Sequence, residues 1–127
     1  MPIHYSIDPA DGRMTTRAEG VVTFHDINAH LDVEQRNRDL HRSELIDARG
    51  ATTDLTAEQV RRLVRRAADM LRITDLGPTA IVTTNDVVYG MARMYSILAE
   101  GVGANAEAFR DMDSAKRWLN RMHDEAD

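Results

Sequence analysis

The segment from Glu44 to Val60 constrains the fold of this chain more than any other part of the sequence. A short apolar run over residues 45–48 is followed by a polar loop and then by strong signals for a helix start. Thr56 stands at a helix N-cap position, and Gln59 follows at the position that completes a capping box. The segment therefore predicts a strand, a loop and a helix in that order, which is the repeating unit of an α/β fold.

Strand and helix signals alternate along the rest of the chain. Period-two alternation on both sides of a turn at residues 9–12 predicts an opening hairpin, and a later continuous apolar run predicts a buried strand. The expected strands cover residues 3–8, 13–19, 43–48, 79–83 and 104–109. The predicted fold class is α/β, a single-layer mixed sheet of about five strands with the order β-β-α-β-α-β-α-β-α.

Helices are expected between and after these strands. The first starts at Thr23 and, because its apolar pattern fades after Leu31, is expected to end early. The second covers residues 57–72 and has a continuous apolar face. Asn85 caps the third, which extends to residue 100, and Asp113 caps the last one.

A single domain covering residues 1–127 is expected, because 127 residues lie near the commonest domain size. Hydrophobic residues make up 43% of the chain and charged residues 29%, which is typical of a globular protein rather than a disordered one. No apolar run is long enough to span a membrane, and the N-terminus lacks the basic and apolar regions of a signal peptide. We expect a soluble, cytoplasmic protein that is not an integral membrane protein.

Charge and residue usage argue against several classes of function. The formal net charge of −5 disfavours nucleic-acid binding, which needs Lys and Arg to neutralise phosphates. Without cysteine the chain has no disulfide and no thiolate metal site. Its five histidines lack metal-ligand spacing, and neither a nucleophile elbow nor a dinucleotide fingerprint is present. We therefore expect no cofactor, no metal site and no catalytic residues.

Two polar loops are candidate binding sites because they follow strands at the edge where α/β sheets hold ligands. The first contains Asp47, Asp54 and Thr56, and the second contains Thr84 and Asn85. Free N–H groups at a helix start favour a phosphate or a carboxylate, and the same position favours phosphorylation of Thr56. Simple helix capping is the competing explanation for these residues.

The third expected helix is apolar over a wider arc than a helix normally buries against one sheet. Met91 belongs to this arc, and Val87, Met94 and Ile97 form its extra flank. These side chains are a candidate interaction surface for a second subunit, a partner protein or a lipid chain, and adaptable Met side chains suit all three. Alternatively, the first or the last helix covers the flank within the monomer.

Residues 45–49 followed by residues 54–56 resemble the STAS, or SpoIIAA-like, superfamily of anti-sigma-factor antagonists. In that family an apolar strand ending in Asp leads to an Asp-Ser-Ser-Gly turn, whose second Ser is phosphorylated by a partner kinase. Asp54 and Thr56 stand at the Asp and phosphorylated positions, while Leu55 and Ala57 replace Ser and Gly. The opening hairpin and residues 108–119 look more like a small stand-alone bacterial branch, related in fold to CRAL-TRIO lipid-binding domains. The resemblance implies a SpoIIAA-like fold.

The leading functional hypothesis is a non-catalytic regulatory or protein-interaction module of STAS type that self-associates as a homodimer. It rests on the wide apolar arc beside a polar helix-start loop. A second hypothesis is a protein that holds a lipid chain or a small anionic ligand between the third helix and the sheet, as the relation to CRAL-TRIO domains implies. A third is an enzyme that uses Asp47, Asp54, Asp86 or Tyr95, although no nucleophile, base and orienting group can be named together.

Overall fold

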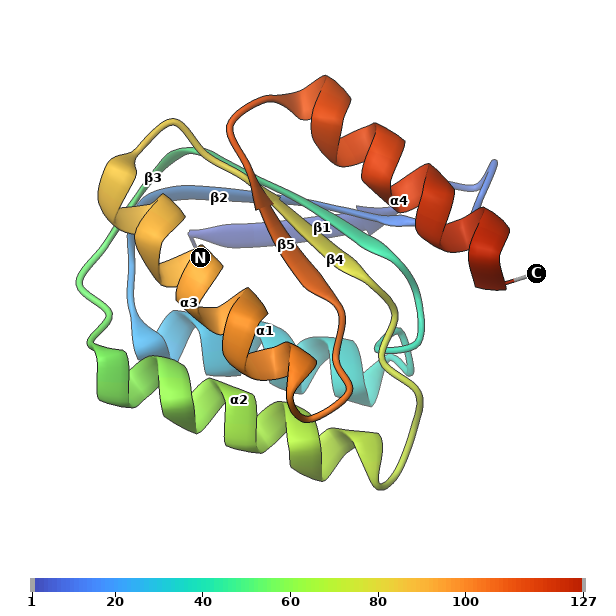
Figure 1. The fold of residues 1–127 in the computed structure, drawn as a ribbon, viewed down its shortest axis with the longest axis horizontal. Coiled ribbons are helices and arrows are strands. Elements are labelled where there is room, and N and C mark those ends of the chain that lie inside the picture. Colours follow the sequence, from blue (N-terminus) through green and yellow to red (C-terminus); the bar gives the residue numbers. More distant parts are fainter. Residues whose placement is uncertain (1, 127) are drawn as a thin grey trace.

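The computed structural model describes residues 2–126 and contains a five-stranded sheet with helices on both faces (Figure 1). The strands are β1 (Ile3–Ile7), β2 (Met14–Val22), β3 (Glu44–Thr53), β4 (Thr79–Val82) and β5 (Ala106–Phe109). The helices are α1 (Phe24–Arg36), α2 (Ala57–Leu71), α3 (Asp86–Glu100) and α4 (Met112–Ala126). This order confirms the predicted α/β class and the predicted succession of strands and helices.

The sheet is mixed, and its strands lie in chain order from β1 to β5. β1 pairs antiparallel with β2, whereas every later pair is parallel. The parallel pairs place the carboxyl ends of β2 to β5 at one edge of the sheet and their amino ends at the other. Figure 1 shows α1, α2 and α3 on one face of the sheet and α4 on the opposite face.

Side chains alternate between the two faces of the sheet and build a core on each side. On the α4 side, Leu45, Ala80 and Val82 pack against Ala115 and Leu119. On the other side the buried residues of the strands are mainly small, namely Ala18, Val22, Ala48 and Ala51, and Ile3, Ile46 and Ile81 pack beside them partly buried. Because small side chains project little from the strands, larger side chains of the helices must fill the space on this face.

The expectation that the first helix ends early is wrong, because α1 continues to Arg36. Its inward face carries His30 and Glu34, which are 7% and 1% exposed. Buried polar residues do not contribute to an apolar pattern, so the periodicity understates the length of this helix. The start of α1 is as predicted, since Thr23 and Asp26 form a capping box.

The last helix begins at Met112, two residues earlier than a cap at Asp113 allows, so the assignment of Asp113 as N-cap is wrong. Asp111 fills that role, because its Oδ1 accepts a hydrogen bond from the N–H of Ser114 at 2.8 Å. Asp113 lies inside α4 instead. Within residues 2–126, no helix combines the length and the apolar content needed to cross a bilayer.

β3 is longer than its sequence pattern indicates. The prediction ended this strand at residue 48, but β3 runs to Thr53 and its second half pairs with β2, up to the pair Val22 and Thr53. β4 pairs with β3 only as far as Asp47, so the second half of β3 has β2 on one side and no strand pairing with β4. Its polar residues are partly exposed there, which is why the segment resembles a loop in sequence.

The loop before β4 depends on a glycine. Gly77 donates its N–H to the carbonyl of Leu40 at 2.9 Å, and a Cβ atom at this position would lie 2.0 Å from the carbonyl oxygen of Arg42. No side chain fits in that space without a backbone shift.

We predict that Gly77→Ala lowers the free energy of unfolding by about 2 to 4 kcal/mol, because the added methyl group collides with backbone atoms. Gly90→Ala is the matched control. A Cβ atom at Gly90, within α3, meets nothing within 4 Å, so this change is expected to stabilise the helix by about 0.5 to 1 kcal/mol. Urea unfolding of both variants measures the difference, and equal stabilities would contradict the described loop.

Candidate functional site

A cavity of about 200 Å³ lies between the sheet and helices α1, α2 and α3, which lie on the same face of the sheet. α2 packs against α3 and lies farther from the sheet than α1 and α3 do (Figure 1). The helices contribute large apolar side chains to the lining, among them Ile27, Val60, Leu63, Val88 and Met91. The strands contribute the small residues Ala18, Ala48 and Ala51, which leave the volume between sheet and helices incompletely filled.

The cavity extends along the direction of the strands. Thr16, Glu44 and Thr79 line it near the amino ends of β2, β3 and β4, and Glu44 and Thr79 are direct neighbours across the sheet. Thr52 and Leu55 line it near the carboxyl end of β3, where Thr52 is exposed and Leu55 is half-buried. The lining therefore reaches the protein surface at one end and terminates in polar residues at the other.

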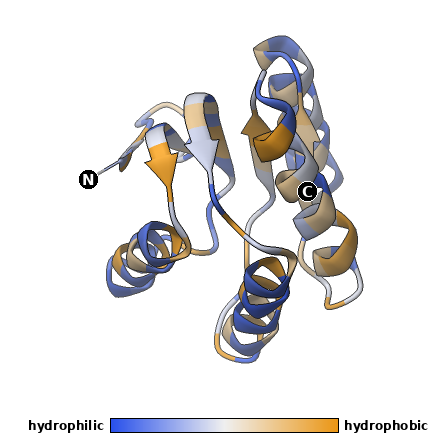
Figure 2. Ribbon diagram, turned by 90° about the vertical axis from the view of Figure 1, so that its left-hand side faces the viewer, coloured by the Kyte–Doolittle hydropathy of each residue, from blue (hydrophilic) through white to orange (hydrophobic). Residues whose placement is uncertain are grey.

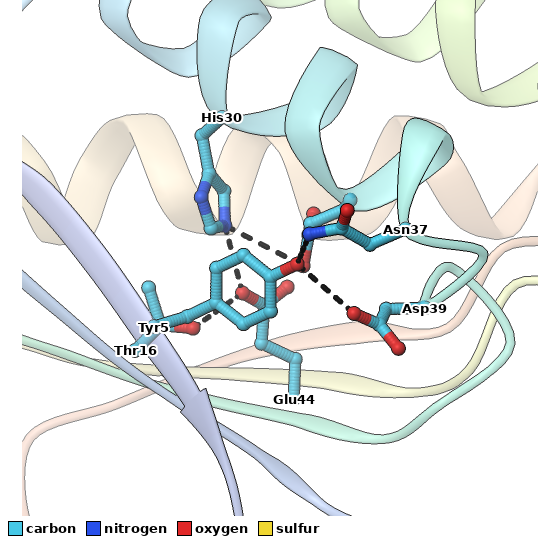
Figure 3. A network of polar contacts seen from close by, with 7 residues as sticks. Tyr5, Thr16, His30, Asn37, Asp39 and Glu44 are labelled. Carbon is cyan, nitrogen blue, oxygen red and sulfur yellow. Dashed lines mark hydrogen bonds and ion pairs between the residues drawn. The ribbon is translucent and has the colours of Figure 1, made fainter.

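Three side chains from different elements meet at the polar end, as Figure 3 shows. Glu44 is the first residue of β3, and its Oε2 lies 2.9 Å from Nε2 of His30 on α1. Thr16 on β2 donates its hydroxyl proton to the same oxygen at 2.6 Å. All three residues are buried. A carboxylate that accepts two hydrogen bonds in a buried position is held in a fixed orientation.

Glu34 completes the cluster from the next turn of α1. His30 and Glu34 are spaced i, i+4, so both side chains lie on the same inward face of the helix. The distance from Glu34 Oε2 to His30 Nε2 is 3.5 Å, which is too long for a strong hydrogen bond. Glu34 Oε2 is fully buried and has no hydrogen-bond partner. We name this group of His30, Glu34 and Glu44 the His-Glu-Glu cluster.

Burial raises the pKa of Glu34 far above its ordinary value. The negative charge of Glu44, a side-chain hydrogen bond with Glu44 and the charge of Asp39 raise it further. Without a bound cation, the protonated form of Glu34 is therefore favoured in the folded protein. Burial and the charge of Glu44 also raise the pKa of the Tyr95 hydroxyl, and Tyr95 lines the same cavity. The negative charge of Glu44 thus favours the protonated forms of Glu34 and Tyr95 at this end of the cavity.

A second layer of polar contacts lies beside this cluster (Figure 3). Tyr5 donates its hydroxyl proton to Asp39 at 2.9 Å and accepts a hydrogen bond from the amide of Asn37 at 2.8 Å. Asp39 also pairs with Arg42, whose Nε lies 2.9 Å from Oδ1. The ring of Tyr5 meets the ring of His30 edge to face at 5.5 Å between centroids. These contacts fix the position of His30 from the side of β1.

The structure separates the candidate residues of the first predicted loop. Asp47 lies within β3 and forms a bidentate ion pair with Arg49, whose Nε and Nη2 each lie 2.9 Å from a carboxylate oxygen of Asp47. These hydrogen bonds lower the pKa of Asp47. Asp54 is exposed, and Thr56 caps α2 in a capping box with Gln59. Asp47 is absent from the cavity lining. The predicted loop therefore provides a helix cap, and its role in anion binding or phosphorylation stays a prediction.

The second predicted loop also provides a cap. Asn85 accepts a hydrogen bond from the N–H of Val88 at 3.0 Å, and its own N–H donates to the buried Thr83 at 3.1 Å. Thr84 is exposed. An anion at this helix start stays a prediction, because the side chain of Asn85 already satisfies one of the free N–H groups.

The predicted interaction surface on α3 is exposed in part. Val87 is 55% exposed and Ile97 is 59% exposed, so neither α1 nor α4 covers them. Met94 is half-buried. Met91 lies on the cavity side and contributes to its lining. The neighbouring Leu98, which is 37% exposed, extends the exposed apolar surface along the helix.

The sequence analysis did not identify the His-Glu-Glu cluster. Its members are spread over α1 and the start of β3, and only the fold brings Glu44 to the other two. One signal was present in the sequence: His30 and Glu34 are four residues apart, at the point where the apolar pattern of the first expected helix fades. Polar residues at inward positions of a helix indicate a buried polar site.

We predict that the stability difference between the wild-type protein and Glu34→Gln depends on pH. Above the ordinary carboxyl pKa the unfolded chain loses the proton that folded Glu34 retains, so wild-type stability falls as pH rises, whereas Gln has no proton to lose. The samples are treated with a chelator so that no metal ion replaces the proton on Glu34. Between pH 5 and 8 the free energy of unfolding of the wild type should fall by up to about 1.4 kcal/mol per pH unit relative to that of the variant.

Glu107→Gln controls for this comparison, because Glu107 is exposed on β5. In urea unfolding, the stability of this control should fall with rising pH as that of the wild type does. If the wild type and Glu34→Gln instead follow parallel profiles, Glu34 is ionised in the folded protein and the described electrostatics are wrong.

Comparison with known proteins supports the architecture. No family model and no curated protein matches the chain. Among solved structures, it is similar to an uncharacterised protein of the DUF3478 family from Shewanella loihica PV-4, which has a SpoIIAA-like fold. The two share 16% sequence identity with a TM-score of 0.57, and the match covers 92% of this chain and 91% of the other. The likeness shows the fold, which is SpoIIAA-like, as the sequence resemblance implies.

Proposed function

We propose that this protein is a non-catalytic binding protein that holds a small, largely apolar molecule in the cavity between the sheet and α1, α2 and α3. The observation that carries the proposal is the cavity itself, with its apolar walls and its single polar end. Small-molecule sites in proteins have this character, with hydrophobic walls and a few placed polar groups.

The lining of the cavity supports occupation, because apolar side chains of the sheet and of α1, α2 and α3 form most of it. A bound molecule would gain contacts with these walls.

The volume also limits the ligand. A cavity of about 150 Å³ in another protein accommodates benzene, whereas typical drug-sized sites begin near 300 Å³. A volume of about 200 Å³ therefore favours one substituted ring or a short alkyl chain over a long-chain lipid. Glu44 and His30 at the polar end favour a ligand with a hydroxyl or another hydrogen-bonding head group.

We predict that Ala48→Leu weakens ligand binding at least tenfold, because Ala48 is 4% exposed and lines the cavity. Calorimetric titration with 1-hexanol and with phenol measures the affinity of both proteins. Ala10→Leu is the matched control, since Ala10 lies in the exposed turn between β1 and β2 and adds the same carbon atoms outside the cavity. Equal affinities for wild type and Ala48→Leu, or no binding of either probe by the wild type, would contradict the proposal.

A second candidate function is the regulatory or protein-interaction module of STAS type, acting through self-association. Its support is the exposed apolar surface of α3, formed by Val87, Ile97 and Leu98. In Figure 2 this helix carries more hydrophobic colour than α1 and α2. Exposed apolar side chains grouped on one helix are typical of an interface. The two functions are compatible because Val87, Ile97 and Leu98 are not part of the cavity lining.

For this second function we predict that Val87→Glu combined with Ile97→Glu abolishes the homodimer, since two desolvated charges would have to enter the interface. Both residues are more than half exposed, so the monomer should remain folded. Arg121→Glu is the control, because Arg121 is exposed on α4, on the opposite face of the sheet, and the change lowers the net charge by the same two units. Sedimentation equilibrium gives the mass. A wild-type protein that is monomeric at all concentrations would exclude the homodimer.

A further inference from the structure

We propose that the His-Glu-Glu cluster is a binding site for one divalent transition-metal ion, with His30, Glu34 and Glu44 as its ligands. Among the described residues, these three place one ligand atom each within 4.8 Å of one another. All three are buried. This inference does not depend on the proposed organic ligand, because it concerns the polar end of the cavity alone.

The distances fit a metal site with little rearrangement. Bonds of about 2.0 to 2.2 Å from Zn²⁺ to nitrogen and oxygen ligands place neighbouring ligand atoms roughly 3 to 4 Å apart. His30 Nε2 already lies 2.9 Å from Glu44 Oε2 and 3.5 Å from Glu34 Oε2. An ion between these atoms would replace the hydrogen bond between His30 and Glu44 with two bonds to metal.

Glu34 provides the independent observation that points to a cation. Glu34 is only 1% exposed, and its Oε2 is buried without a hydrogen-bond partner. Leaving a buried polar atom unpaired is unfavourable, and native proteins rarely do so. No Lys or Arg pairs with Glu34 or Glu44 among the ion pairs of residues 2–126. A bound cation would satisfy the free oxygen and neutralise both carboxylates.

The surroundings of the cluster have the features of a metal site rather than of an isolated ion pair. Thr16 donates a hydrogen bond to Glu44 Oε2 at 2.6 Å, and the ring of Tyr5 packs edge to face on His30. Contacts of this kind hold metal ligands in fixed orientations. Because His30 and Glu44 also line the cavity, a coordination position beyond the three protein ligands would face it.

The ligand set favours a particular class of ion. One imidazole and two carboxylates, without a thiolate, suit Zn²⁺, Co²⁺, Fe²⁺ or Mn²⁺ better than Cu⁺. The prediction of no metal site rested on the absence of cysteine and on the spacing of the histidines, and neither detects a site built from one His and two Glu. Here two of the ligands come from one helix at i, i+4 and the third from a strand, so no sequence motif records the site.

A proton shared between Glu34 and Glu44 is the competing explanation for the same geometry. It accounts for the raised pKa of Glu34 with no ion present. The two explanations differ in what a metal titration shows. Protons and metal compete for the same carboxylate oxygens, so a metal site binds its ion more weakly as pH falls, whereas the competing explanation predicts no saturable metal binding near neutral pH.

Titration of the untagged, chelator-treated full chain with Co²⁺ tests the proposal directly. Visible absorption of the bound Co²⁺ reports its coordination, and we expect saturation at one ion per chain, with displacement by Zn²⁺. Glu34→Gln should bind Co²⁺ at least tenfold more weakly. Since Gln resembles the protonated form of Glu34, this variant should keep its fold, which urea unfolding verifies.

Glu58→Gln serves as the control for loss of a carboxylate and should bind Co²⁺ as the wild type does, because Glu58 is exposed on α2. Two results would overturn the proposal. One is the absence of saturable Co²⁺ binding by the wild type up to millimolar metal. The other is equal affinity in wild type and Glu34→Gln, which would assign the binding to surface histidines.

Discussion

The contact between His30 and Glu44 joins α1 to the sheet. It connects the middle of α1 to the first residue of β3, and Thr16 extends the connection to β2. Burial makes this contact consequential, because a carboxylate enclosed in protein must be fully hydrogen-bonded or neutralised. Glu34 increases that demand, since it adds a second buried carboxyl group with a free oxygen.

Small side chains on the sheet leave space between the sheet and the helices. Ala18, Ala48 and Ala51 occupy inward positions where strands of a packed core usually carry Val, Ile or Leu. Side chains of α1, α2 and α3 line the resulting space. The cavity therefore follows from the sequence of the strands, and its polar end follows from the His-Glu-Glu cluster. In this account one structural feature supplies both an apolar volume and a place for a polar head group.

The sequence predicted the fold well because its strongest signals are local. Capping residues such as Thr23 and Thr56 and the apolar face of α2 mark element boundaries without reference to the rest of the chain. The lengths of helices and strands were less well predicted where the polarity of the residues does not match their burial in the fold. The second half of β3 looks like a loop because it is half exposed, and α1 looks short because its inward residues are polar.

The site was harder to predict than the fold, because its components are distant in the sequence. Glu44 stands at the start of a strand, where nothing in its neighbourhood distinguishes it from a surface residue, and only the packing of α1 on β2 and β3 encloses it. The predicted sites at Thr56 and Asn85 relied on helix-start chemistry, which the same residues also use for capping. The exposed side chains Val87 and Ile97 were identified because helical periodicity shows an excess apolar arc directly.

Native mass spectrometry of the protein isolated from its own cells, without added ligand, tests the central claim that the cavity is a binding site. The account predicts a population heavier than the bare chain by the mass of one small organic molecule per protomer, and this mass should be lost on mild activation or in Ala48→Leu. A bare protein mass in every oligomeric state, together with unchanged stability on addition of small apolar molecules, would contradict it.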